Sequence, residues 1–240
     1  MSLLPTEKSE RNTNLSDQII LVYGRAGIGK STLCAQFPNA LFLATEPGLN
    51  HLEVFKTNIT SWKSFMVACA EIAKGEHKFK TIVIDTIDRL IPLCQNYIEE
   101  ENEVDYIGNL PMGKGWFLVT QELSRTLVKL ASLPYGLVLV SHSKQEEIET
   151  KTAKFNRFTI DIGGKNQNAI LNLMDIALFM DSEMRSGEEV SVVRTKPSLY
   201  WEAKDKSKLL PDKIDFPPDK PEVAYKVIAT AFKNEKEKKP

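Results

Sequence analysis

The 240-residue sequence predicts a three-layer α/β fold in which helices cover both faces of a mainly parallel sheet. Five short apolar runs alternate with longer segments of helical periodicity, and polar or glycine residues bound each run. Such runs are typical of strands that are buried on both faces of a parallel sheet. We expect strands at 19–23, 40–44, 81–84, 137–140 and 176–180, and helices at about 30–36, 62–74, 87–101, 115–131 and 166–174.

Two insertions interrupt this alternation before the sheet ends. Residues 102–114 (NEVDYIGNLPMGK) are expected to form a loop. Residues 143–165 begin with charged side chains and continue into the alternating FNRFTIDIG, which predicts a mobile hairpin. VSVV (190–193) and SLYWEA (198–203) predict antiparallel strands at the edge of the sheet.

The two ends of the chain differ from the part between them. Residues 1–16 are polar and lack periodicity, which predicts a flexible or docking arm, and residues 17–215 carry the strand–helix alternation. The range 216–240 holds a proline-rich spacer, a closing helix and a charged tail. The closing helix is expected to bury a stripe formed by Val223, Val227, Ile228 and Ala231.

Composition excludes several classes of protein. The 31 basic and 32 acidic residues leave a net charge of -1, so no global charge attracts the chain to DNA or to an anionic membrane. No apolar run approaches the roughly 18 residues that cross a bilayer, and the N-terminus lacks the pattern of a secretory signal. The three cysteines form no CxxC pair and the histidines are scattered, so we expect free thiols, no Cys/His metal site and a cytoplasmic location without membrane contact.

The most specific motif is the glycine-rich GRAGIGKS at 24–31, which matches the phosphate-loop pattern GxxxxGK[ST]. It follows an apolar run and precedes a helix, so its backbone N–H groups and the helix dipole would face phosphate oxygens. Lys30 would reach the β- and γ-phosphates of ATP, and the Ser31 hydroxyl would coordinate Mg²⁺. The predicted nucleotide-binding residues are Gly24, Arg25, Ala26, Gly27, Ile28, Gly29, Lys30, Ser31 and Thr32.

A second metal ligand is expected where TIVIDTID (81–88) leaves the sheet. Asp85 ends the apolar run at the carboxyl edge, where open α/β sheets bind ligands, and we assign it to the Mg²⁺ site with Ser31. Asp88 is expected in the first turn of the next helix, where it would interact with the helix dipole.

The catalytic carboxylate is predicted at a different strand. Many ATPases carry a glutamate directly after the metal-binding aspartate, but this sequence has Thr86. Glu46, in LFLATEPGLN just past the strand at 40–44, is the other available carboxylate, and we predict that it polarises the attacking water. The alternative is a loop glutamate that precedes the Pro47–Gly48 turn.

These motifs, in this order, resemble the RecA-type recombinase ATPases, and they look most similar to the phage-encoded nucleotide-binding proteins of single-strand annealing recombination. The resemblance rests on GRAGIGKST, TEPG, TIVIDTID, GKGW, LVSH, RTKPS and EAKDK and spans about residues 18–215. It implies a RecA-like P-loop NTPase core that uses ATP and Mg²⁺. It also implies a homo-oligomeric ring or filament that acts on single-stranded DNA, in the host cytoplasm if the protein is phage-encoded.

The resemblance also implies roles for single residues. Glu46 occupies the place of the catalytic glutamate of the RecA group. Ser141 and His142 follow the fourth strand, where RecA-like proteins place a polar residue that senses the γ-phosphate, although a histidine that caps a strand end is equally consistent. Lys204 and Lys206 resemble basic residues that reach into a neighbouring subunit's ATP site, or they belong to a solvated charge run. Relatives tend to carry arginine at the second position, so Lys206 is a departure.

In RecA-like proteins the loops after the third and fourth core strands face single-stranded DNA, which corresponds here to 102–115 and 143–165. The second segment interleaves aromatic and basic side chains, a composition that suits base stacking beside phosphate pairing. A hairpin whose phenylalanines pack on the domain explains the same pattern. The candidate DNA contacts are Lys151, Lys154, Phe155, Arg157 and Phe158.

The leading functional hypothesis is an ATP-hydrolysing RecA-like protein that acts on single-stranded DNA in phage-type recombination or annealing. A P-loop kinase or transferase acting on a small molecule is the first alternative, but its lid would need several arginines, and the arginines of this chain are dispersed. An ATP-dependent assembly or loading factor that never touches DNA is the second alternative.

Overall fold

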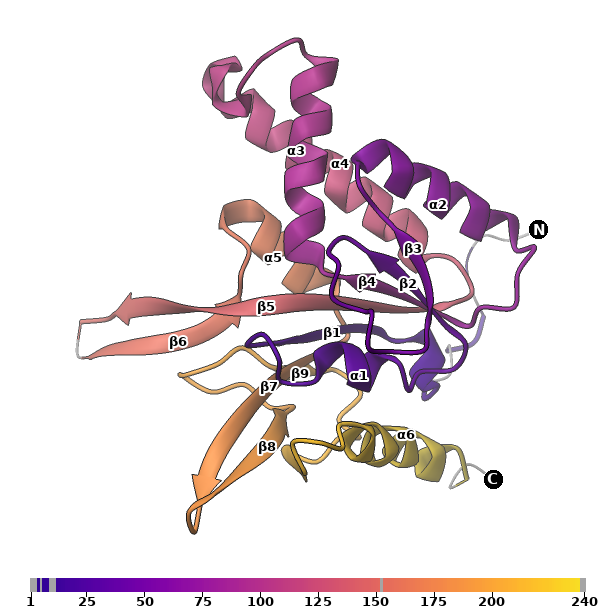
Figure 1. Ribbon diagram of the computed structural model, residues 1–240, viewed down its shortest axis with the longest axis vertical. Coiled ribbons are helices and arrows are strands. Elements are labelled where there is room, and N and C mark those ends of the chain that lie inside the picture. The colour runs from indigo at the N-terminus through magenta and orange to yellow at the C-terminus, as the bar shows by residue number, and fades with distance from the viewer. Residues whose placement is uncertain (1–3, 5, 9–11, 152, 238–240) are drawn as a thin grey trace.

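A mainly parallel sheet lies between two layers of helices in the computed structural model, which describes residues 4, 6–8, 12–151 and 153–237 (Figure 1). The strands are β1 (Ile19–Gly24), β2 (Ala40–Ala44), β3 (Phe55–Asn58), β4 (Thr81–Asp85), β5 (Gly136–Glu149), β6 (Lys154–Ile160), β7 (Ile176–Arg185), β8 (Glu188–Arg194), β9 (Lys204–Asp205) and β10 (Lys213–Phe216). The helices are α1 (Lys30–Cys34), α2 (Trp62–Lys74), α3 (Ile87–Glu101), α4 (Lys114–Ala131), α5 (Gly164–Leu173) and α6 (Glu222–Glu237), with the 3₁₀ helices η1 (Leu15–Asp17), η2 (Ile107–Asn109) and η3 (Pro111–Gly113). The predicted three-layer α/β fold is confirmed.

The order of strands decides where the polar strand ends meet. Across the sheet the order is β10-β8-β7-β1-β5-β4-β2-β3. The strands from β7 to β3 run parallel, whereas β8 and β10 are antiparallel at one edge. β6 and β9 pair antiparallel with β5 and β7. The turn after β1 therefore lies beside the middle of β5 and near the carboxyl end of β4, at the edge where open α/β sheets bind ligands.

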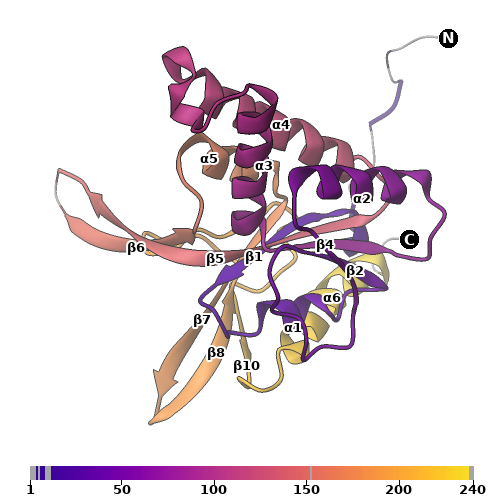
Figure 2. The same cartoon turned by 45° about the horizontal axis from the view of Figure 1, so that its top comes forward.

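The central strands are buried on both faces because their alternate side chains enter two different cores. In β1, Leu21 and Tyr23 belong to one core, whereas Ile20 and Val22 belong to the other. Figures 1 and 2 show α2, α3, α4 and α5 over the first face of the sheet and α1 and α6 over the second. This double burial is why the strands read in the sequence as unbroken apolar runs.

Local signals define the ends of α2. The Ser61 hydroxyl accepts a hydrogen bond from the Ser64 N–H, and the Ser64 hydroxyl accepts one from the Ser61 N–H, both at 3.1 Å. Gly75, with φ of 75°, ends the helix in the left-handed conformation. Trp62 and Phe65 are buried against the sheet, so capping and burial agree on where this helix lies.

The edges of the sheet differ from the prediction. Residues 198–203 form no strand but an isolated bridge to Phe158. The Phe158 N–H donates to the Tyr200 carbonyl oxygen, and the Phe158 carbonyl oxygen accepts from the Glu202 N–H. The antiparallel edge is instead β10, and β3 and β9 were not predicted. All four side chains of β3 are exposed, so no apolar run marks that strand in the sequence.

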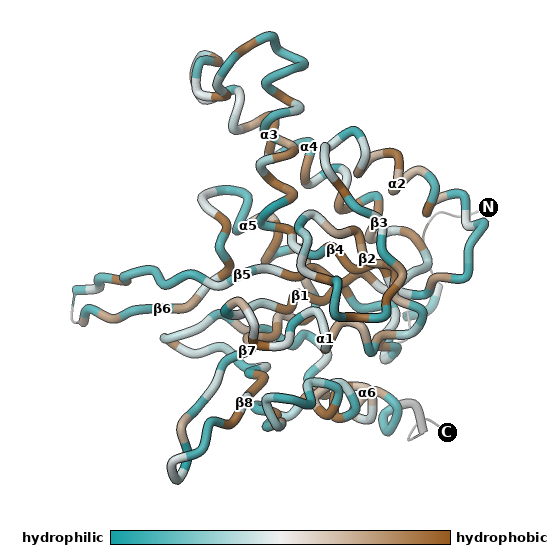
Figure 3. The backbone as a smooth tube through the Cα atoms, in the orientation of Figure 1, coloured by the Kyte–Doolittle hydropathy of each residue, from teal (hydrophilic) through white to brown (hydrophobic). Residues whose placement is uncertain are grey.

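Several parts of the chain project from the body of the sheet, among them the hairpin of β7 and β8 (Figures 1 and 2). β5 continues past the core as an antiparallel hairpin with β6, which confirms the hairpin predicted within 143–165. Figure 3 shows mainly hydrophilic residues along its outer part. The ends of α3 and α4 and the loop between them, which contains η2 and η3, extend beyond the other helices (Figure 2). No helix in the described part of the chain is both long and apolar enough to cross a membrane.

The closing helix packs on the core with most of the predicted stripe: Ile228 is buried, and Val223 and Ala231 are partly buried against the core. Ala224, Ile228 and Phe232 are buried at helical spacing, whereas Val227 is 37% exposed. The helix packs beside α1. Of the predicted arm at 1–16, residues 1–3, 5 and 9–11 lie outside the described residues, as do residues 238–240 of the predicted tail.

The two neighbouring positions on α6 give a matched test of this packing. Ile228→Ala removes a side chain that is 1% exposed and should lower the free energy of unfolding by about 2–5 kcal/mol. Val227→Ala should change it by less than about 0.5 kcal/mol. Urea unfolding followed by circular dichroism measures both values, and equal losses would mean that the helix buries a different face.

Candidate functional site

Polar residues from four different strands meet at the carboxyl edge of the sheet. The register places Gly24 opposite His142, and Asp85 opposite both Val140 and Ala44. The carboxyl ends of β1, β4 and β2 therefore lie within two residues of one another across the sheet, beside Val140–His142 of β5, which continues beyond them as the hairpin. They enclose a cavity of about 480 Å³ whose lining includes Lys30, Ser31, Glu46, Asp85, Thr86 and His142.

The phosphate loop curls over this cavity between β1 and α1. Gly29 has φ of 95°, a left-handed conformation that strongly favours glycine. Lys30 Nζ donates hydrogen bonds to the carbonyl oxygens of Gly24 and Arg25, both at 2.9 Å. Burial lowers the pKa of Lys30, and the Asp85 carboxylate opposes that shift. The Lys30 amine is thus held against the backbone of the phosphate loop, in a cavity that is also lined by Glu46 and Asp85.

The predicted nucleotide-binding residues do not all face the cavity. Ala26, Gly27, Gly29, Lys30, Ser31 and Thr32 line it. The Arg25 side chain instead forms an ion pair with Glu189 of β8, and Ile28 is buried in the core on the α1 side of the sheet. Backbone contact with phosphate, which is what the loop prediction requires of Arg25 and Ile28, does not depend on where these two side chains lie.

Ser31 and Asp85 are in direct contact, as the metal-site prediction requires. Ser31 Oγ donates to Asp85 Oδ2 at 2.7 Å. Burial raises the pKa of Asp85, and the hydrogen bond from Ser31 opposes the shift. The buried hydroxyl of Thr86 also lines the cavity and has no hydrogen-bond partner. Hydroxyl and carboxylate oxygens are the donors that Mg²⁺ prefers, so the residues fit this ion.

The protein alone does not complete a metal coordination sphere. Among the described residues, no cluster of three or more His, Cys, Asp or Glu side chains could hold a metal ion. Mg²⁺ at such sites takes its remaining ligands from substrate phosphates and water. The Ser31–Asp85 pair therefore suits a metal ion that arrives with a nucleotide.

Glu46 is brought to the cavity by a clamp between the ends of β2 and β4. The Thr45 N–H donates to the Asp85 carbonyl oxygen at 2.9 Å. Thr45 Oγ1 donates to the Thr86 carbonyl oxygen at 2.9 Å and accepts from the Thr86 N–H at 2.8 Å. The peptide bond between Asp85 and Thr86 is cis. The next side chain along the chain, Glu46, is half-buried and lines the cavity.

His142 lies between two carboxylates. Its Nδ1 is 3.0 Å from Asp88 Oδ2, and its Nε2 is 3.9 Å from Glu46 Oε1. The Asp88 Oδ1 atom also accepts a hydrogen bond from the His142 backbone N–H at 3.1 Å. Arg89 Nε approaches Glu46 Oε2 at 3.8 Å from the exposed side.

Sequence reasoning did not identify Asp88 and Thr45 as parts of this site. Asp88 does lie in the first turn of α3, as predicted, but its carboxylate is directed at His142. The contact joins residues 54 positions apart in the sequence. No local pattern could have paired them, because the contact depends on β4 and β5 being neighbours.

Lys204 and Lys206 lie far from the phosphate loop of their own chain. β9 pairs with the first residues of β7, level with the start of β1, whereas the phosphate loop follows the end of β1. Lys204 Nζ donates to the Leu171 carbonyl oxygen at 3.0 Å, and Lys206 Nζ pairs with Asp175 Oδ1 at 2.9 Å. These residues do not reach the cavity in their own chain.

The hairpin side chains that were predicted to contact DNA are mostly engaged within the protein. Arg157 pairs with Glu202 at 2.8 Å, and Lys154 pairs with Glu147. Phe155 makes an edge contact with Tyr200, with ring centroids 5.8 Å apart.

Phe158 stacks on the core residue Phe179 at 5.3 Å. Phe158 therefore packs against the core, as expected for a hairpin whose phenylalanines pack on the domain. Lys151, next to the hairpin turn, is exposed.

Exposed aromatic side chains gather instead on the segment that leads into α4. Tyr106, Trp116 and Phe117 are 55%, 44% and 57% exposed. Trp116 and Phe117, together with Lys165 and Asp88, line a second cavity of about 590 Å³ between α3, α4 and the start of α5. Because Asp88 lines this cavity and also contacts His142, the two cavities share a wall.

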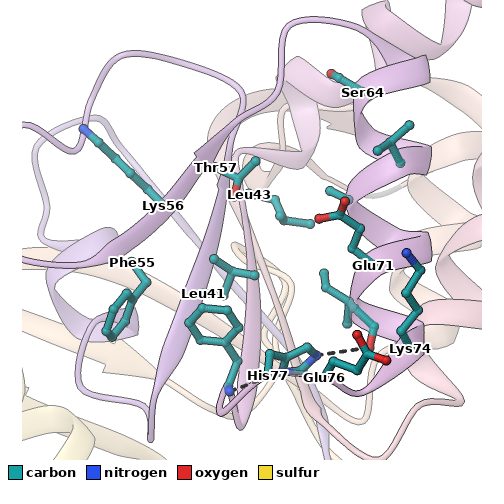
Figure 4. A pocket seen from close by; sticks show the side chains of 14 residues that line it. Leu41, Leu43, Phe55, Lys56, Thr57, Ser64, Glu71, Lys74, Glu76 and His77 are labelled. Carbon is teal, nitrogen blue, oxygen red and sulfur yellow. Dashed lines mark hydrogen bonds between the residues drawn. The ribbon is translucent and has the colours of Figure 1, made fainter.

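A wider cavity of about 770 Å³ lies between α2 and the strands β2 and β3 (Figure 4). Leu41 and Leu43 form part of its apolar surface, and its charged side chains have both signs, as Figure 4 shows for Glu71 and Lys74. It contains no glycine-rich loop. The chemistry of phosphate binding therefore belongs to the smaller cavity at the phosphate loop.

The geometry agrees with the comparison to known families. The sequence matches the AAA domain family over residues 16–207, which is 192 of the 240 residues. The chain belongs to this family of P-loop ATPases. Membership accounts for the nucleotide-binding loop and supports nucleotide hydrolysis in general.

Two individual proteins share weaker similarity with this AAA-family chain. The SPbeta prophage-derived uncharacterized protein YorG of Bacillus subtilis is 24% identical over 139 residues, which cover 55% of this chain and 43% of YorG. This chain therefore matches less than half of the length of YorG. The flagellar accessory protein FlaH from Methanocaldococcus jannaschii superposes with a TM-score of 0.47 at 9% identity, over 84% of this chain and 85% of FlaH. A score of that size supports no inference about function.

Two glycines that line the same cavity test the geometry of the phosphate loop. In Gly29→Ala the new Cβ would lie 2.7 Å from Pro221 Cγ at a left-handed φ. Because that backbone conformation costs an L-residue about 1–2 kcal/mol, nucleotide affinity should fall about tenfold. Gly48→Ala meets no atom within 4 Å and should bind a fluorescent ATP analogue as the wild type does. Equal affinities for the two variants would contradict this account of the loop.

Proposed function

We propose that this chain binds ATP with Mg²⁺ at the phosphate loop, hydrolyses it, and couples hydrolysis to action on single-stranded DNA in phage-type recombination or annealing. The convergence of Lys30, Ser31, Glu46, Asp85 and His142 on one cavity carries the hydrolytic part of the proposal. Their roles follow from the chemistry of each group and from the distances between them.

Each side chain has a distinct task in hydrolysis. Lys30 exchanges its two loop carbonyls for oxygens of the β- and γ-phosphates, where its positive charge offsets the charge of the transition state. Ser31 and Asp85 would hold the metal ion, which would neutralise charge on the phosphate oxygens. Glu46 accepts a proton from the water that attacks the γ-phosphorus, while the bond to the β-phosphate oxygen breaks.

The aromatic segment before and within α4 supports contact with single-stranded DNA. Trp116 and Phe117 expose planar rings, and the neighbouring Lys165 adds a positive charge. Stacking on aromatic side chains beside basic groups is how proteins bind unpaired strands without sequence preference. The prophage origin of YorG agrees with a phage-type role, although YorG itself is uncharacterised.

Oligomerisation belongs to the same proposal. Lys204 and Lys206 lie at the opposite end of the sheet from their own phosphate loop, so any role at an ATP site requires another copy of the chain. Both lysines would first have to leave their present partners, the Leu171 carbonyl and Asp175.

Two substitutions separate nucleotide binding from hydrolysis. Lys30→Ala should weaken ATP binding and abolish turnover, because it removes the cation that meets the phosphates. Glu46→Gln should keep ATP binding within about threefold and lower kcat by about 10²- to 10⁴-fold, the usual contribution of a general base. Phosphate release with Mg²⁺, with and without single-stranded DNA at low salt, measures turnover. A Glu46→Gln variant with wild-type kcat would exclude Glu46 as the base.

The DNA role has its own test on α4. Trp116→Ala and Phe117→Ala should each weaken binding of a single-stranded oligonucleotide about tenfold, because stacking contributes about 1–3 kcal/mol per base. Val128→Ala removes another exposed apolar side chain of the same helix and should leave DNA binding unchanged. Fluorescence anisotropy at low salt measures the affinities. If the wild type binds no oligonucleotide and DNA does not change its turnover, an assembly factor or a kinase becomes the better explanation.

A further inference from the structure

Asp88 uses both of its carboxylate oxygens on one residue. Oδ1 accepts the backbone N–H of His142 at 3.1 Å, and Oδ2 lies 3.0 Å from His142 Nδ1. The Asp88 side chain is only 6% exposed and that of His142 is 24% exposed. A largely buried carboxylate with two aligned contacts orients both the backbone and the ring of its partner.

The chemistry of this contact selects one form of the imidazole. An ionised carboxylate accepts hydrogen bonds and donates none, so Nδ1 must carry the hydrogen. In the neutral ring the other nitrogen, Nε2, is then an unprotonated acceptor. Nε2 is the atom that faces Glu46 in the phosphate cavity.

His142 Nε2 and the Glu46 carboxylate are far enough apart to accept hydrogen bonds from one water molecule between them. Their 3.9 Å separation is too long for a direct hydrogen bond. Two acceptors at this distance can each take a hydrogen bond of about 2.8 Å from one water, at an angle of about 90°. Such a water directs both of its hydrogens to the protein and leaves its lone pairs free.

We infer that Asp88 is a positioning residue that keeps His142 in the Nδ1–H form, so that Nε2 and Glu46 together hold the attacking water of ATP hydrolysis. This inference rests on the proposed hydrolytic function. The water oxygen bonds to the γ-phosphorus, its proton passes to Glu46, and ADP leaves with the electron pair of the broken P–O bond. His142 acts as an acceptor toward water and not as a neutral donor to the γ-phosphate, which differs from the sensor role implied by the resemblance to RecA-like proteins.

A simple effect of Asp88 on the α3 dipole is the competing explanation. A dipole effect needs only a negative charge in the first turn of α3. Positioning needs two acceptor oxygens at hydrogen-bond distance from the backbone N–H and Nδ1 of His142. Asp88→Asn removes the charge and leaves one acceptor oxygen. If that oxygen stays on the backbone N–H, the amide NH₂ faces Nδ1 and reverses the tautomer. Asp88→Glu keeps the charge but changes the reach.

The tautomer can be measured directly on the full chain with ¹⁵N-labelled histidine. Ring ¹⁵N chemical shifts distinguish the two neutral forms, and the His142 signals are those absent from His142→Gln. We expect the Nδ1–H form in the wild type and the Nε2–H form in Asp88→Asn. A wild-type spectrum with the Nε2–H form overturns the inference, and that measurement requires no Asp88 variant to fold.

Turnover supplies the second readout. Asp88→Asn should lower kcat at least about 10²-fold with KM for ATP within about threefold, as expected when a catalytic histidine is held in the wrong tautomer. Asp88→Glu should also lose activity, whereas a dipole effect predicts that it behaves as the wild type.

The outcomes separate this inference from the proposed function. If the wild type hydrolyses ATP and Asp88→Asn retains its kcat, the positioning role is overturned and the proposed function stands. If the wild type hydrolyses no ATP, the proposed function is overturned, and the assignment of the water with it.

Discussion

The burial of parallel strands between two helical layers is the constraint on which the rest of the structure depends. Each of β1, β2, β4 and β5 sends alternate side chains into two cores, so none of them can slip in register without placing apolar residues on the wrong face. That register brings Gly24 opposite His142 and places Asp85 two residues away, opposite Val140, at one edge of the sheet. The phosphate cavity is thus a consequence of how the strands are packed.

The electrostatics of the cavity are set by an excess of carboxylates around one buried amine. Asp85, Asp88 and Glu46 all raise the pKa of Lys30, against the larger lowering effect of burial. The carboxylates in turn need partners: Ser31 donates to Asp85, and His142 contacts both Asp88 and Glu46. A nucleotide with its metal ion brings charges of both signs into this arrangement. The site is therefore suited to a ligand that is itself an ion pair.

His142 connects this cavity to the parts of the molecule that project from it. It is the last residue of β5 that pairs with β1, and the hairpin with β6 begins at the next residue. Its carbonyl oxygen accepts the Asp161 N–H at 2.8 Å, where β6 leads toward α5. Asp88 contacts His142 and also lines the cavity beside α4 that contains Trp116 and Phe117. His142 and Asp88 therefore lie between the cavity at the phosphate loop and the cavity beside α4.

The fold class, the central buried strands and the phosphate loop could be predicted from the sequence, because apolar runs and glycine spacing are local properties of the chain. The sequence also predicted that Ser31 and Asp85 would share a metal site and that Glu46 would face the γ-phosphate, whereas for His142 the resemblance implied a γ-phosphate contact and a strand-capping role was equally consistent. Other features follow from the tertiary structure: the exposed edge strand β3, the stacking of Phe158 on Phe179, the distance of Lys204 from the site, and the Asp88–His142 contact. Each of these features depends on which strands are neighbours and on which side chains a second element covers. A local sequence pattern contains no information about either.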